Sequence, residues 1–304
     1  MSSSACHAAL CAAFLLVAAP CLPAAAPHPL LDFARERAAK REAPHGASTQ
    51  SGLKAAQHAL EQANAPAAGQ CAESIGATRF AELHSEIATS RSAEGDFAGA
   101  AEAFRAALDC KPRDATLHAA VAGSLFDARD YAGARKAIDT ALDIDPRSIE
   151  ANRLAGNLDF IDERWADAIA RFRYVAASDN GRTPAAYGQL MYWLAQARSG
   201  VAHPDFVVRT PTDGWPQPLL LYLRGEYTEA ELLRPIRDGD DDSNSQPNTS
   251  TDERLCEALF YVGEAYWARG DRKSAQDYFA ALVNLRIIYF LEHGLALAEI
   301  AKLR

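Results

Sequence analysis

An alanine recurs at an interval of 34 residues through the middle of the sequence, at Ala100, Ala134 and Ala168. Each of these alanines follows an aromatic residue by three positions, and the aromatic residues are Phe97, Tyr131 and Trp165. A fixed interval of this length indicates repeated structural units that stack on one another. The interval therefore excludes most folds that have a single aperiodic core.

Within the unit 115–147, apolar residues predict a pair of helices. Leu117, Val121 and Leu125 fall every four residues, so they share one face of a first helix. The second helix should run from Tyr131 to Ile144, since Pro146 has no N–H to donate and ends a helix.

The interval and its small and aromatic positions are typical of tetratricopeptide repeats. The alternative is a set of unrelated amphipathic helices with alanine-rich faces, but three consecutive units in register argue against it. One helix pair cannot cover its own apolar faces, so the units must stack. We therefore predict an all-α fold, a right-handed superhelix of tetratricopeptide hairpins with degenerate central repeats and a C-terminal capping helix.

Composition along the chain divides it into five parts. We expect a signal peptide at 1–26, a linker with one or two short helices at 27–76, three repeat units at 77–182, degenerate units with insertions and an acidic loop at 183–254, and a final unit with its capping helix at 255–304.

The first 26 residues resemble an export signal, with an apolar stretch from Ala8 to Ala19 and a tail of small residues. Cys21 follows Pro20, which suits lipid attachment poorly. We therefore expect a periplasmic protein, with anchoring as an outer-membrane lipoprotein less favoured. The rest of the chain has no apolar run of 18 residues, so we expect no membrane span there.

Two cysteines could form a disulfide in an oxidising compartment. Cys110 should end the second helix of the first unit, and Cys71 should lie shortly before its first helix. Antiparallel packing of the two helices brings those ends together. A Cys71–Cys110 bridge and two buried thiols both remain open.

Charge and motifs argue against several classes of function. The net charge of −9 disfavours nucleic-acid binding, which needs a basic face. The sequence has no nucleophile motif, glycine-rich phosphate loop or metal-ligand spacing. We therefore expect a protein that is not an enzyme and that uses no cofactor and no metal.

Stacked repeats expose the first helix of each unit on an inner face, where the fifth and ninth positions of a unit contact a peptide. These positions are Ser85 and Thr89, Ala119 and Gly123, Arg153 and Asn157, and Phe260 and Glu264. Arg153 and Asn157 resemble half of a carboxylate clamp. We expect a partner-binding groove lined by Arg153, Asn157, Phe126, Phe160, Glu264 and Trp267. The alternative is that these side chains only pack against neighbouring helices.

The C-terminal third carries more specific features. They are Trp215 with a turn at Gly225, the run 260–263, the pair Gly270-Asp271 and the closing segment 290–299. With these features the stretch 78–301 resembles the NlpI family of periplasmic tetratricopeptide proteins, which occurs in Gram-negative bacteria. The poor lipid-attachment site and the long acidic stretch 238–253 depart from that family.

The resemblance implies a homodimeric adaptor. Members of this family are usually lipoproteins that bring murein endopeptidases to a carboxyl-terminal processing protease and scaffold cell-wall enzymes. Our first hypothesis is therefore a non-enzymatic periplasmic adaptor that binds protein or peptide partners. The alternative is a structural or assembly subunit of an envelope complex that acts through oligomerisation.

Overall fold

The computed structural model describes residues 28–40, 47–62, 77–178, 183–202, 204–206, 214–237, 251–288 and 290–303. These ranges hold fourteen α-helices and no strand. The expected signal peptide at 1–26, Cys71 and residues 238–250 of the acidic loop lie outside the described residues.

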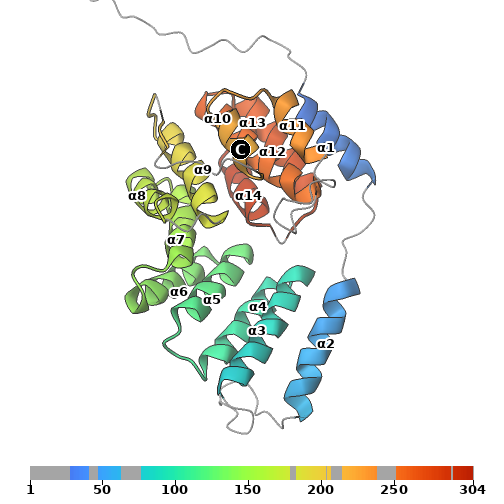
Figure 1. Cartoon of the computed structure of the whole chain (residues 1–304), viewed down its shortest axis with the longest axis vertical. Helices are drawn as coiled ribbons and strands as arrows, with labels where there is room; N and C mark the ends of the chain where they lie inside the picture. The colour runs from blue at the N-terminus through green and yellow to red at the C-terminus, as the bar shows by residue number, and fades with distance from the viewer. Residues whose placement is uncertain are drawn as a thin grey trace, which may run out of the picture.

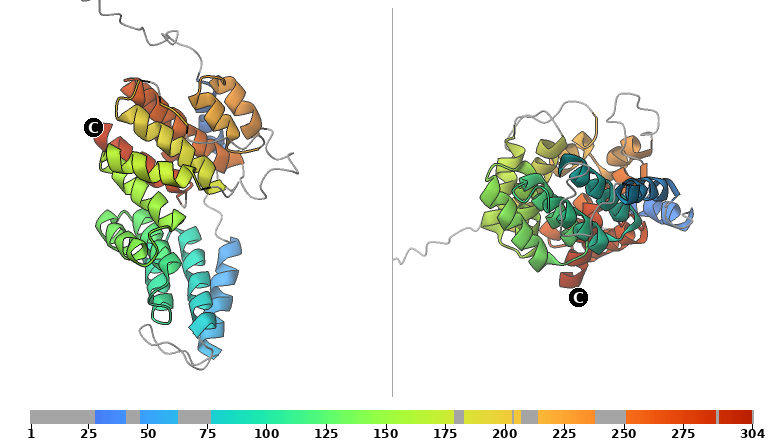
Figure 2. Two further views of the ribbon diagram at one scale, coloured as in Figure 1. Left: turned by 60° about the vertical axis from the view of Figure 1, so that its left-hand side comes forward. Right: turned by 90° about the horizontal axis from the view of Figure 1, so that it is seen from below.

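Six consecutive helices form three hairpins between residues 77 and 176 (Figure 1). They are α3 (Ala77–Glu94) with α4 (Phe97–Leu108), α5 (Ala115–Asp127) with α6 (Tyr131–Ile144), and α7 (Ile149–Ile161) with α8 (Trp165–Ala176). Each helix packs against the next along the chain, so the hairpins form one continuous stack. Two further views show the same succession from teal to yellow-green (Figure 2).

The remaining helices come before and after this stack. They are α1 (Pro29–Lys40), α2 (Ala47–Gln62), α9 (Thr183–Arg198), α10 (Gln217–Leu223), α11 (Glu229–Arg237), α12 (Thr251–Ala268), α13 (Arg272–Asn284) and α14 (Leu291–Leu303). Helix α1 packs against α11, α12 and α13, whereas α2 packs against α3. Successive helices α1 and α2 thus lie at opposite ends of the molecule (Figure 1).

The turn inside each hairpin repeats with the same interval as the alanines. Gly95, Arg129 and Glu163, which are 34 residues apart, all have positive φ, at 83°, 62° and 57°. In the first two hairpins, the residue after the turn is an aspartate, Asp96 or Asp130, that caps the second helix. Its side chain accepts a hydrogen bond from the backbone N–H three residues later. A residue with positive φ, followed by a helix cap, therefore precedes the second helix of these hairpins.

Small residues allow the helices of a hairpin to approach closely. Ala100, Ala134 and Ala168 are all fully buried. A Cβ added to Gly188 on α9 would lie 2.7 Å from the backbone nitrogen of Ala176, so α8 and α9 touch there through backbone. The recurring alanines are thus positions where a larger side chain would force the helices apart.

The interior divides into two main apolar clusters. The smaller cluster joins α2, α3 and α4, and its buried members are Ala56, Leu83, Ile87, Ala88, Ala100 and Ala103. The larger one extends through the rest of the stack into α1 and α9–α14. Within the described ranges, no helix is long and apolar enough to cross a membrane.

Candidate functional site

Most of the side chains expected to line a groove lie inside the molecule. Phe126, Phe160, Asn157 and Glu264 have no exposed surface. Helix α14 packs against α5, α7 and α12, which carry these four residues, and so lies on the inner face of the later units. This corrects the expectation of an open groove at these positions, since α14 fills the space that a partner would need.

Glu264 and Trp267 surround a buried arginine on α9. Arg198 donates hydrogen bonds to Glu264 (Nη1 to Oε2, 2.5 Å) and to Glu299 of α14 (3.0 Å). Its guanidinium carbon lies 4.0 Å from the centre of the Trp267 ring. Burial raises the pKa of Glu264 to about 8, Glu299 adds to this rise, and Arg198 opposes it. These two hydrogen bonds of Arg198 fasten α14 to α9 and α12.

The expected carboxylate clamp is not formed. Arg153 donates both Nε (2.9 Å) and Nη2 (2.5 Å) to Glu150 on its own helix. Neither polar atom of the buried Asn157 amide has a hydrogen-bond partner among the described residues. Arg153 is therefore already neutralised, and Asn157 faces the interior.

Burial raises the pKa of two carboxyl groups near the start of α14. Glu292 is 5% exposed, and burial raises its pKa to about 7. Glu257 accepts hydrogen bonds from Tyr187 Oη (2.6 Å) and Trp215 Nε1 (2.7 Å). Burial raises the pKa of Glu257 well above its usual range, and the proximity of Glu292 raises it further. These two buried acids belong to the packing of α14 rather than to an accessible site.

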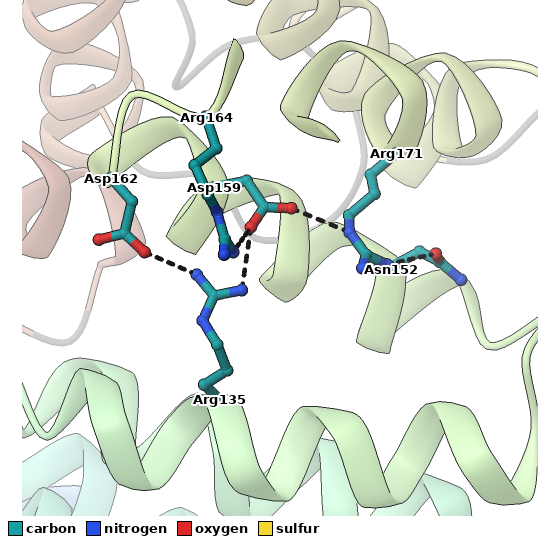
Figure 3. Close-up of polar contacts among 6 residues, drawn as sticks. All are labelled: Arg135, Asn152, Asp159, Asp162, Arg164 and Arg171. Carbon is teal, nitrogen blue, oxygen red and sulfur yellow. Dashed lines mark hydrogen bonds and ion pairs between the residues drawn. The ribbon is translucent and has the colours of Figure 1, made fainter. Parts of the chain in front are cut away.

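A second charged cluster joins the second and third units (Figure 3). Asp159 of α7, whose side chain is 1% exposed, accepts hydrogen bonds from Arg135 Nη1 of α6 (2.9 Å) and from Arg171 Nε of α8 (2.9 Å). Arg164, from the turn before α8, also donates to Asp159. Arg135 reaches the exposed Asp162 as well (2.8 Å). One buried carboxylate thus holds three consecutive helices together.

Sequence reasoning did not single out Asp159. The available signal was an acidic residue in the otherwise apolar run 158–161 at the end of α7. A charge at such a position is buried only if it is paired, so it predicts cationic partners on neighbouring helices. All three arginines satisfy this requirement, and the Asp159 side chain is 1% exposed.

An open groove of about 570 Å³ does exist, along the first unit. From α3 it is lined by Ala81, Glu82, Ser85, Glu86, Thr89 and Ser90, and from the approach to α5 and its first turn by Lys111, Asp114 and Leu117. Ser85 and Thr89 are the fifth and ninth positions of that unit, which the periodicity placed on the inner face. The inner face is therefore open along α3, whereas α14 packs against its continuation on α5 and α7.

The two other predicted features of the site concern cysteine and metal. Cys110 is disulfide-bonded. Because Cys71 lies outside the described residues, its pairing with Cys110 stays a prediction. Among the described residues no three His, Cys, Asp or Glu side chains gather in a way that could hold a metal ion.

Comparison with known families agrees with this geometry. A family model described as Tetratricopeptide repeat matches residues 92–158, which run from the end of α3 into α7. These residues are tetratricopeptide repeats. The predicted all-α tetratricopeptide superhelix is confirmed by this match together with the fourteen described helices. Tetratricopeptide repeats generally mediate protein–protein interactions, and their all-helical fold is typically non-catalytic.

Proposed function

We propose that this protein is a non-enzymatic adaptor that binds a segment of a partner protein in the groove along α3. The observation that carries the proposal is the location of the open groove along α3. The groove lies on the inner face of the first unit, at Ser85 and Thr89, where tetratricopeptide units contact peptides. Elsewhere on that face α14 takes the place of a partner.

The finer parts of the proposal come from the sequence. The N-terminal stretch supports export to the periplasm, with an outer-membrane anchor less favoured because Pro20 precedes Cys21. Resemblance to the NlpI family supports a homodimer whose partners are a murein endopeptidase and a carboxyl-terminal processing protease. In this reading the protein brings a hydrolase and a protease together, and it contributes binding surface but no chemistry.

The proposal is tested by selecting peptides with the purified protein. A display library of random linear peptides is panned against the wild type, and each enriched peptide is then measured against Thr89→Trp and Thr140→Trp. Thr89 lies in the groove and Thr140 lies on the outer helix α6, and each exposed hydroxyl donates to the carbonyl four residues earlier (2.9 and 3.0 Å). The two substitutions therefore disturb their helices equally.

We expect enriched peptides to lose most of their affinity for Thr89→Trp and to retain it for Thr140→Trp. Peptides that bind both variants like the wild type would refute a groove along α3. A protein that selects no peptide, but whose self-association is lost in Thr89→Trp, would support the alternative of an assembly subunit.

A further inference from the structure

We propose that the groove along α3 recognises an extended segment with lysine or arginine at alternate positions. This rests on the proposed function, since it specifies the chemistry of the segment that the same groove binds. Three features of the groove support it, namely the charge of its lining, the direction of its hydrogen bonds and the spacing of its carboxylates.

The lining carries an excess of negative charge. Glu82, Glu86 and Asp114 face a single cation, Lys111, which gives a net charge of −2. Arg79 beside the groove contacts both glutamates, but through the same Nη1 atom at 3.3 Å to each. Both glutamate side chains remain 53% exposed, and exposed pairs of this kind are weak. The carboxylates can therefore take up further cations.

The hydroxyl groups of the groove present acceptors rather than donors. Ser85 Oγ donates to the carbonyl oxygen of Ala81 (2.8 Å), and Thr89 Oγ1 donates to that of Ser85 (2.9 Å). With their hydrogens used inside α3, both oxygens offer only lone pairs to a partner. Carboxylates and hydroxyls together thus favour a ligand rich in N–H donors, as lysine and arginine side chains are. Nucleic acid and acidic segments are repelled by the same lining.

Alternate side chains of an extended ligand match the spacing of the carboxylates. Glu82 and Glu86 are four residues apart, which places their Cβ atoms about 5–6 Å from each other. In an extended chain, alternate side chains point to the same side and lie about 6.6 Å apart.

The test uses fluorescence anisotropy with three labelled ten-residue peptides of serine and alanine. The first has lysine at three alternate positions, the second has glutamate there, and the third has three lysines spaced four apart. Each is titrated with the wild type and with Glu82→Gln/Glu86→Gln. The control is Asp139→Asn/Asp143→Asn, which removes the same two charges at the same spacing from exposed positions on the outer helix α6.

We expect the alternate-lysine peptide to bind best and to bind the Glu82→Gln/Glu86→Gln variant about tenfold more weakly, since two exposed ion pairs are lost. The Asp139→Asn/Asp143→Asn control should bind like the wild type. Equal binding of the glutamate peptide, an unaffected glutamine variant, or tighter binding of the peptide with lysines four apart would each overturn the proposal. Loss of self-association in the glutamine variant without peptide binding would assign the groove to a second copy and overturn it too.

Failure of this inference is distinguishable from failure of the proposed function. Neutral or acidic library peptides that bind the wild type and fail to bind Thr89→Trp would leave the adaptor groove standing and refute its preference for basic segments. Library peptides that are all insensitive to Thr89→Trp would refute both.

Discussion

Removing the charge of Asp159 should be among the most damaging single changes to this fold. The side chain is 1% exposed and accepts hydrogen bonds from Arg135, Arg164 and Arg171, which come from different parts of the second and third units. Asp159→Asn keeps the size of the side chain but replaces one acceptor oxygen by a donor and removes the charge. Three guanidinium groups then face one another without their shared counter-ion.

The expected cost is about 3 kcal/mol. Breaking a buried ion pair by removing one partner costs roughly 3–5 kcal/mol. The lower end applies because the three arginine side chains are 25%, 45% and 32% exposed, so water can partly solvate the orphaned charges. For a chain of this size, 3 kcal/mol corresponds to a fall in Tm of about 6–12 °C.

Asp162→Asn is the matched control. Asp162 also accepts a hydrogen bond from Arg135 (2.8 Å), but its side chain is 51% exposed. An exposed pair contributes less than about 1 kcal/mol, so this variant should unfold almost like the wild type. Urea unfolding followed by circular dichroism measures both free energies of unfolding.

A loss below about 1 kcal/mol in Asp159→Asn would refute the reasoning. It would mean that the three arginines repel each other as much as Asp159 attracts them, so that the cluster holds no helices together. Equal losses in the two variants would refute the argument from burial.

Three further changes test other parts of the fold. Arg129→Gly should raise the free energy of unfolding by up to about 1 kcal/mol, because glycine adopts the observed φ of 62° without strain; an unchanged urea midpoint would contradict this. Gly188→Ala should lower the Tm by several degrees, since the new Cβ meets the backbone nitrogen of Ala176 at 2.7 Å; a wild-type Tm would show that α8 and α9 separate easily. The wild type should lose stability as pH rises from about 4.5 to about 7, because burial raises the pKa of Glu292 from 4.5 to about 7 and the folded state holds a proton that the unfolded state releases. Glu292→Gln should make the fall in Tm over that window shallower, and an unchanged profile would contradict the assignment.

The hairpins could be predicted closely because their signals are local. The second helix of the second unit runs from Tyr131 to Ile144, as expected from the period and from Pro146. The left-handed turn residues and aspartate caps recur with the same interval. Such features depend on residues within one unit, so one sequence suffices to find them.

The position of α14 could not be predicted in this way. Its contacts join residues far apart in sequence, such as Arg198 and Glu299, which are 101 positions apart. Asn157 and Glu264 occupy the ninth position of their units, where tetratricopeptide units contact a peptide, and this suggested an inner surface open to a partner. Both are fully buried, and α14 packs against the helices that carry them.

The sequence predicted only part of the lining of the groove along α3. Ser85 and Thr89 followed from the period, but the carboxylates beside them did not stand out, because charges on a helix usually indicate only a solvated face. Glu82 and Glu86 become candidates for binding a partner because they line the groove and share a contact with Arg79. Neither feature can be seen in the sequence.

The central claim is that α14 is a permanent part of the inner face and that partners bind beside it, along α3. Amide hydrogen exchange, followed by mass spectrometry with and without a peptide selected from the library, tests both halves of this claim. We predict slower exchange in 77–94 and in the first turn of α5 when the peptide is bound, with no change in Leu291–Leu303. Faster exchange in α14 on binding, or unchanged exchange in α3, would contradict the account.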